Sequence, residues 1–177
     1  MVEIRLLNDK NFSLESLDSF DRHQEVENVY RQVDGKLMLR RHPFTEDWSQ
    51  ERRREKASEI LPGRHIVYGA FEDGHVVGGV MLVPELDHGR MVIDSFHVSR
   101  ECRRHGIGRR LFETAVQEAR NRGATALYML ACSAQETMDF YLAMGCRISE
   151  HPIPSYVANE PFDIQLEYDD FRGSVPR

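Results

Sequence analysis

A short basic segment with two glycines, Arg103-Arg104-His105-Gly106-Ile107-Gly108, has the residue types best suited to binding an anion. It follows an apolar run that ends at Val98 and precedes an amphipathic segment over residues 109–122. Glycines permit the backbone angles that let successive amide N–H groups converge on one anion, and the first turn of a helix adds unpaired N–H groups and a positive dipole end. The segment therefore predicts a strand, a loop that binds phosphate or pyrophosphate, and a helix start.

Two common phosphate-binding motifs do not fit this segment. A P-loop needs a lysine and then Ser or Thr after its last glycine, whereas Gly108 is followed by Arg109 and Arg110. A dinucleotide-binding loop needs a third glycine, where this chain has Leu111, and an acidic residue at the end of the next strand, where it has Ala131-Cys132-Ser133. A different phosphate carrier is therefore expected.

The segment resembles the cofactor loop of the GNAT superfamily of N-acetyltransferases. That loop reads Arg or Gln, two residues, Gly, one residue, then Gly or Ala, and Arg103, Gly106 and Gly108 match it. A second feature of the family is an aromatic-Tyr pair late in the next helix, shortly before a glycine, and Phe140-Tyr141 ahead of Gly145 carries it. The two motifs lie about a helix, a strand and a helix apart, as the family requires.

This resemblance, which spans mainly residues 67–166, implies a reaction. It implies transfer of an acetyl group from acetyl-CoA to a primary amine by direct attack in a ternary complex, without a metal. It fits a small bacterial-type member whose amine is unassigned, and it leaves a longer acyl-CoA open as the donor. The alternative is a non-catalytic, acetyl-CoA-binding regulatory protein with the same fold. A third hypothesis, an interaction module built on Arg52-Arg53-Arg54, predicts no acetyl-CoA binding.

The resemblance also implies where acetyl-CoA binds. In the family, the strand before the loop and the strand after its helix splay apart, and the pantetheine arm enters the gap. Here these strands are residues 91–98 and 126–131. Unpaired backbone groups of Phe96 and Val98 are expected to bond the arm as an edge strand would, with the Phe96 N–H directed at the thioester oxygen. The other expected acetyl-CoA contacts are His97, Arg103, Arg104, His105, Gly106, Ile107, Gly108, Arg109, Ser133 and Phe140.

Tyr141 is expected to act as the general acid, because it occupies the family's position for the group that protonates the departing thiolate. The structural alternative is an aromatic side chain that packs on the sheet beside Phe140. Cys132, just after a strand, offers a covalent acetyl-cysteine route, but it lacks an evident histidine partner in the sequence. The family generally transfers the acetyl group directly.

Asp94 is expected to act as the general base. It alternates with Phe96 and Val98 in an apolar strand, where an acidic side chain is costly without a partner or a purpose. A hydrogen-bonded structural carboxylate is the alternative interpretation. Glu85, His97 or a chain of water molecules are the competing bases.

Composition limits the class of protein. With 177 residues, 41% hydrophobic and 29% charged, the chain is expected to form one domain over residues 1–177. A formal net charge of −6 argues against sequence-independent binding of nucleic acid and favours a small-molecule or peptide amine as partner. No run of about 18 apolar residues occurs, so we expect a cytoplasmic protein that does not enter membranes. Three cysteines without CxxC spacing suggest neither a disulfide framework nor a zinc site.

The expected fold is α/β, with a mixed, mostly antiparallel central sheet flanked by helices and with splayed central strands. Residues 26–39 read as a hairpin around Asp34-Gly35, although a helix broken at that glycine also fits. The segment 162–168 is a possible homodimer interface, and the tail 172–177 is expected to be loose. The other expected strands are 2–7, 65–71, 75–83, 91–98, 126–131 and 146–149, and the helices are near 14–20, 49–61, 109–122 and 135–144.

Overall fold

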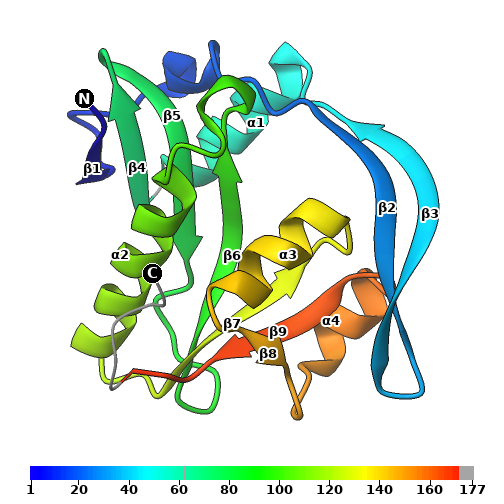
Figure 1. The fold of residues 1–177 in the computed structure, drawn as a ribbon. Coiled ribbons are helices and arrows are strands. Elements are labelled where there is room, and N and C mark those ends of the chain that lie inside the picture. The colour runs from blue at the N-terminus through cyan, green and yellow to red at the C-terminus, as the bar shows by residue number, and fades with distance from the viewer. Residues whose placement is uncertain (62, 172–177) are drawn as a thin grey trace.

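The computed structural model describes residues 1–61 and 63–171, and the expected loose tail lies outside them (Figure 1). Its strands are β1 (Glu3–Leu6), β2 (Gln24–Val33), β3 (Lys36–Glu46), β4 (Ile66–Glu72), β5 (His75–Leu82), β6 (Arg90–Val98), β7 (Ala126–Ala131), β8 (Arg147–Ile148) and β9 (Ile164–Tyr168). Its helices are η1 (Leu14–Leu17), α1 (Gln50–Ile60), η2 (Arg100–Cys102), α2 (Ile107–Asn121), α3 (Gln135–Ala143) and α4 (Pro154–Asn159).

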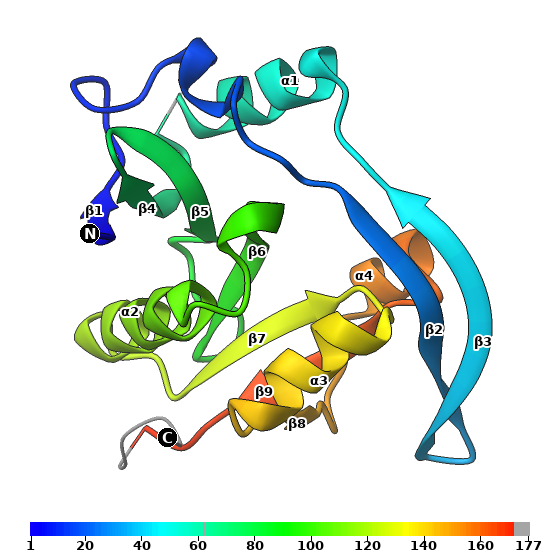
Figure 2. The ribbon, with the colours of Figure 1, turned by 45° about the horizontal axis from the view of Figure 1, so that its top comes forward.

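The described residues form a seven-stranded sheet in the order β1-β4-β5-β6-β7-β9-β8. Its neighbouring strands run antiparallel apart from β6 and β7, which run parallel, so the expected mixed sheet is confirmed. Buried residues of α2 and α3 pack on one face of the sheet in the main core cluster. Helix α1 lies beside η1 (Figure 2), and buried residues of the two pack in a second cluster with Phe71 and Val76.

The two parallel strands separate partway along their length, as expected. Pairing of β6 with β7 ends at Ile93 and Met129. Beyond that point β6 stays paired with β5 up to Val98, while β7 stays paired with β9 up to Ala131. The sheet therefore opens into a gap whose sides are the last residues of β6 and β7.

A β-bulge lies where the gap begins. Ser95 pairs with Met81, whereas Ile93 pairs with Leu82, so Asp94 is an extra residue of β6. Because of this insertion, Ile93 and Phe96 both pack in the core cluster on the α2 side, although they are three residues apart. The expectation that Asp94 alternates regularly with Phe96 is therefore wrong.

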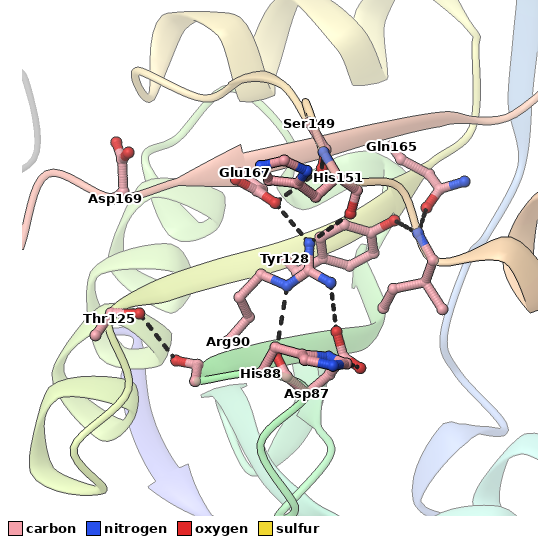
Figure 3. Close-up of polar contacts among 12 residues, drawn as sticks. Asp87, His88, Arg90, Thr125, Tyr128, Ser149, His151, Gln165, Glu167 and Asp169 are labelled. Carbon is pink, nitrogen blue, oxygen red and sulfur yellow. Dashed lines mark hydrogen bonds and ion pairs between the residues drawn. The ribbon is translucent and has the colours of Figure 1, made fainter.

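A polar network holds β6, β7 and β9 together at the closed end of the gap (Figure 3). The Arg90 guanidinium donates to Glu167 Oε1 and to the His151 carbonyl oxygen, both at 2.7 Å. It also lies over the Tyr128 ring at 4.5 Å and pairs with Asp87. Because Arg90 belongs to β6 and Glu167 to β9, the network fixes the strands on either side of β7 where the gap starts.

Helix α2 begins at Ile107, two residues before the expected start, because Gly106 in the left-handed region (φ +82°) is its N-cap. Its other end is set by Gly123, which caps the helix in the left-handed region. Gly123 has a φ of +75°, its N–H donates to the Arg120 carbonyl, and the Ala124 N–H donates to the Ala119 carbonyl. Both ends of α2 are thus set by glycines.

The segment 26–39 is a hairpin as expected, but β2 and β3 extend well beyond it and form a separate two-stranded sheet. At the other end of the chain, a short helix, α4, connects β8 and β9. Strand β9 pairs with β8 over Leu166 and Glu167 as well as with β7. A second copy therefore cannot pair edge to edge along that part of the expected interface 162–168.

The three consecutive arginines of α1 make contacts within the chain. Arg52 pairs with Glu55, and Arg54 pairs with Asp18. The Arg53 guanidinium donates to the Phe20 carbonyl oxygen at 3.2 Å. These contacts fasten α1 to η1 and the segment after it, which gives the basic run a structural role.

Candidate active site

The two sequence motifs meet on the α2 and α3 side of the gap. A Cβ added at Gly108 would lie 3.2 Å from Cε2 of Phe140, so the second loop glycine permits this close approach. The Phe140 ring in turn lies 5.5 Å from the Phe96 ring, measured between centroids. The glycine loop, β6 and α3 are therefore packed around one point.

Tyr141 lies in this aromatic group and is only 5% exposed. Its ring centroid is 6.1 Å from that of Phe96 and 6.4 Å from that of Phe112. Burial raises the pKa of Tyr141, and Cys146 adds a smaller effect, so the hydroxyl stays protonated at neutral pH. A protonated hydroxyl suits a proton donor, and the packing also fits the structural alternative, so the catalytic role stays a prediction.

The backbone of β6 presents alternate residues to the gap. The Ser99 N–H donates to the Val77 carbonyl of β5 at 2.8 Å, and His97 pairs with Gly79 of the same strand. Because backbone groups alternate along a strand, those of Phe96 and Val98 face the opposite way, toward the gap. The structure thus brings Phe96 and Val98 to the gap as expected, but it directs the backbone of His97 to β5.

Arg103 ties the glycine loop to the rest of the molecule. Its Nε donates to the Val98 carbonyl oxygen and its Nη2 to the Arg22 carbonyl oxygen, both at 3.0 Å. Burial lowers the pKa of Arg103. The guanidinium therefore holds the end of β6 and the segment before β2, a contact that the sequence did not indicate.

The loop itself is open and exposed. Arg104 adopts a positive φ of +65°, and Arg104, His105 and Gly106 are exposed. A Cβ added at Gly106 would meet no atom of residues 1–61 and 63–171 within 4 Å. Ile107 is buried and anchors the first turn of α2, while Arg109 is half-buried two residues further on. The open space at Gly106 and the N–H groups at the start of a 15-residue helix are suited to a pyrophosphate group.

Ser133 lies where the β2–β3 hairpin docks on the rest of the chain. Its Oγ accepts from Nη1 of Arg31 at 2.8 Å, and its carbonyl oxygen accepts from the Tyr30 N–H at 2.7 Å. The Tyr30 hydroxyl donates to Asp139 of α3 at 2.8 Å. No local pattern indicated Tyr30 or Arg31, because the contact joins residues about 100 positions apart.

Asp94 lies on the face of the sheet away from Tyr141. Its Oδ2 is 3.8 Å from Nε2 of His65, the residue before β4. Tyr156 of α4 is also nearby, because the Asp94 charge contributes, after burial, to raising the pKa of Tyr156. The expected acid and base are thus on opposite faces of the gap, while Glu85, a competing base, is exposed in the loop after β5.

His97, the other competing base, is half-buried on the face of β6 opposite Phe96. Its ring packs edge-on against Trp48, with 4.8 Å between centroids. Burial and the nearby cations, Arg22 and Lys56 first among them, lower the pKa of His97 to about 3. An imidazole with so low a pKa is a poor proton acceptor at neutral pH, so the environment disfavours His97 as the base.

We expect His97 to make the protein less stable in acid. Its pKa is about 3 in the folded chain and 6.5 in the unfolded chain. The unfolded state therefore binds more protons between these values, and stability falls as pH falls below 6.5. Relative to neutral pH, the loss from His97 at pH 5 is about 2 kcal/mol. Urea unfolding at both pH values should show a smaller loss for His97→Gln than for the exposed control His75→Gln. Equal losses would contradict the prediction.

Residues 36–146 match the sequence model of the Acetyltransferase (GNAT) family. The match covers more than half of the chain, so this protein belongs to that family, and the gap between β6 and β7 with its glycine loop is the region in which the two family motifs meet. No curated protein sequence matches the chain.

Solved structures share the fold at low sequence identity. Nourseothricin acetyltransferase is 20% identical with a TM-score of 0.70, and the match covers 94% of this chain and 95% of that one. A putative streptothricin acetyltransferase from Bacillus anthracis, solved with acetyl coenzyme A, is 16% identical with a TM-score of 0.71 and coverages of 94% and 96%. The ribosomal-protein-S18-alanine N-acetyltransferase of Escherichia coli is 14% identical, with a TM-score of 0.59 and coverages of 100% and 96%.

Proposed function

We propose that this protein transfers the acetyl group of acetyl-CoA to a primary amine by direct attack in a ternary complex. The observation that carries the proposal is the gap between β6 and β7. The glycine loop at the start of α2 lies at one end of this gap. Tyr141 lies near the gap on one face of the sheet, and Asp94 lies near it on the other face. An acid and a base on opposite sides of a thioester are what acetyl transfer to an amine needs.

Each residue has one task in this proposal. Acetyl-CoA supplies an activated acyl group. The loop amides and the start of α2 bind its pyrophosphate, and the Phe96 N–H stabilises the negative charge that develops on the thioester oxygen. Asp94 takes a proton from the attacking nitrogen, and Tyr141 gives a proton to the departing sulfur.

The surroundings of Cys132 support direct transfer over an acetyl-cysteine route. Burial raises the pKa of the Cys132 thiol, and Glu46, whose Oε1 is 4.0 Å from the sulfur, raises it further. Since the thiolate is the nucleophilic form, a protonated thiol beside a carboxylate is a poor acyl acceptor.

Acidic side chains near the open end of the gap favour a positively charged acceptor. Burial, together with Glu160 and Glu46, raises the pKa of Asp163 to about 6. A cation that binds beside several carboxylates reduces the electrostatic repulsion between them. Nourseothricin, streptothricin and an alanine of a ribosomal protein are the acceptors named for three similar structures, so both small molecules and a protein amine belong in a first test.

The test measures release of free thiol from acetyl-CoA with a panel of amines. We expect turnover with an acceptor that carries a second positive charge, such as a polyamine or an aminoglycoside antibiotic. Salt should raise KM for this acceptor more than for a neutral primary amine, because it screens the carboxylates. Binding of acetyl-CoA by calorimetry without turnover of any amine would instead favour the regulatory protein.

We also propose that the protein acts in the cytoplasm, without a nucleic-acid partner, as one domain that forms homodimers. The net charge of −6 supports the absence of nucleic acid. In the described part of the chain, no helix is both long and apolar enough to cross a membrane.

A further inference from the structure

His65 lies directly before β4 and two strands away from β6 in the sheet order. Nε2 of His65 is 3.8 Å from Oδ2 of Asp94. The side chain of His65 is 25% exposed and that of Asp94 is 38% exposed. The pair is thus partly screened from water, but the carboxylate keeps an open side.

The β-bulge gives Asp94 its place in this pair. Asp94 is the first residue of β6 after the last pair with β7, Ile93 and Met129. As the extra residue of the bulge, it lies with His65 and Tyr156 and apart from the core side chains of Ile93 and Phe96. Bulges commonly re-aim a side chain beside a functional site, and this one places a carboxylate at the mouth of the gap.

The other nitrogen of His65 identifies the tautomer. Nδ1 is buried and has no hydrogen-bond partner within residues 1–61 and 63–171. A neutral imidazole has one N–H group, and burying it without an acceptor is costlier than directing it at a carboxylate. The proton is therefore assigned to Nε2, which faces Asp94.

We propose that His65 is a positioning residue for Asp94, a role that rests on the proposed function. Its Nε2–H faces Oδ2 at 3.8 Å, beyond hydrogen-bond length, so it attracts this oxygen electrostatically and leaves the other carboxylate oxygen for the amine. As the nitrogen forms its bond to the acetyl carbon and the carbon–sulfur bond breaks, one N–H bond breaks and an O–H bond forms on Asp94. The departing sulfur takes its proton from Tyr141, and solvent later restores both residues.

A double-mutant cycle of kcat with acetyl-CoA and the best amine of the panel tests this role. His65→Leu should lower kcat by up to about 100-fold, because the base loses its orientation, without changing the Kd of acetyl-CoA. His65→Gln, which keeps an N–H donor, should restore most of the loss. In an Asp94→Asn background, His65→Leu should have no further effect. His88→Leu is the matched control, because His88 also lies beside an aspartate, Asp87 at 3.1 Å, but its side chain is 89% exposed.

Independent, multiplying effects of the two substitutions would overturn the inference, as would full activity of His65→Leu. Absence of turnover by the wild type with every amine would overturn it together with the proposed function. If His65→Leu does not fold, the same cycle is run with His65→Phe, which keeps a ring but has no N–H donor. An unchanged kcat of His65→Phe would overturn the pairing.

Discussion

Replacing Gly106 by Glu is expected to weaken acetyl-CoA binding at least about 100-fold, which corresponds to about 2.7 kcal/mol. A Cβ at this position meets no atom within 4 Å, so the new side chain fits the folded chain and extends into the space in front of the first turn of α2. Its negative charge would then occupy the place of the pyrophosphate. Isothermal titration calorimetry with acetyl-CoA measures the effect.

Gly123→Glu is the matched control for backbone strain. Gly123 lies just beyond the other end of α2 and has a similar positive φ of +75°, and among the described residues no atom lies within 4 Å of an added Cβ. Both substitutions place a side chain in the left-handed region, at a cost of about 1–2 kcal/mol. Only Gly106→Glu should lose affinity, and equal affinities of the two variants would remove the glycine loop from the acetyl-CoA site.

Replacing Tyr141 by Phe is expected to lower kcat by roughly 100-fold while leaving the Kd of acetyl-CoA unchanged. The change removes the hydroxyl that donates the proton to the departing sulfur, and general acid catalysis typically contributes 10²- to 10⁴-fold. The ring and its packing against Phe96 and Phe112 are kept. The initial rate of thiol release at saturating acetyl-CoA and amine gives kcat.

Tyr168→Phe controls for loss of a buried hydroxyl. Tyr168 is 1% exposed, packs 5.3 Å from the same Phe112 ring, and its hydroxyl has no hydrogen-bond partner in the described part of the chain. It should keep full activity. If Tyr141→Phe is equally active, Tyr141 is a packing residue and another group protonates the sulfur.

Local patterns predicted most of the fold because they act over short distances. The strand over residues 126–131 was predicted with the bounds that the structure has, since its apolar run is buried on both faces. The hairpin around Asp34-Gly35 formed because both residues accept a positive φ, at +49° and +75°. Helix α2 ends shortly before Gly123, because this glycine also accepts a positive φ, of +75°.

The candidate site was predictable where its residues belong to one motif. Arg103, Gly106 and Gly108 form one local motif, and Phe140 with Tyr141 form another, so each is recognisable from neighbouring residues alone. The structure then brings Gly108 and Phe140 together, because α2 and α3 pack on the same face of the sheet. That the strands on either side splay apart was implied by the family resemblance, and the pairing that ends at Ile93 confirms it.

By itself, the sequence determined the glycine loop, the helix behind it and the family, because each depends on neighbouring residues in the chain. Only the tertiary structure decided which side chains meet at the mouth of the gap. The bulge that re-aims Asp94 depends on its register with Met81 and Leu82 of β5, and His65 reaches it from two strands away. Register and packing between distant segments are set by the whole sheet, so a pattern read along one strand cannot contain them.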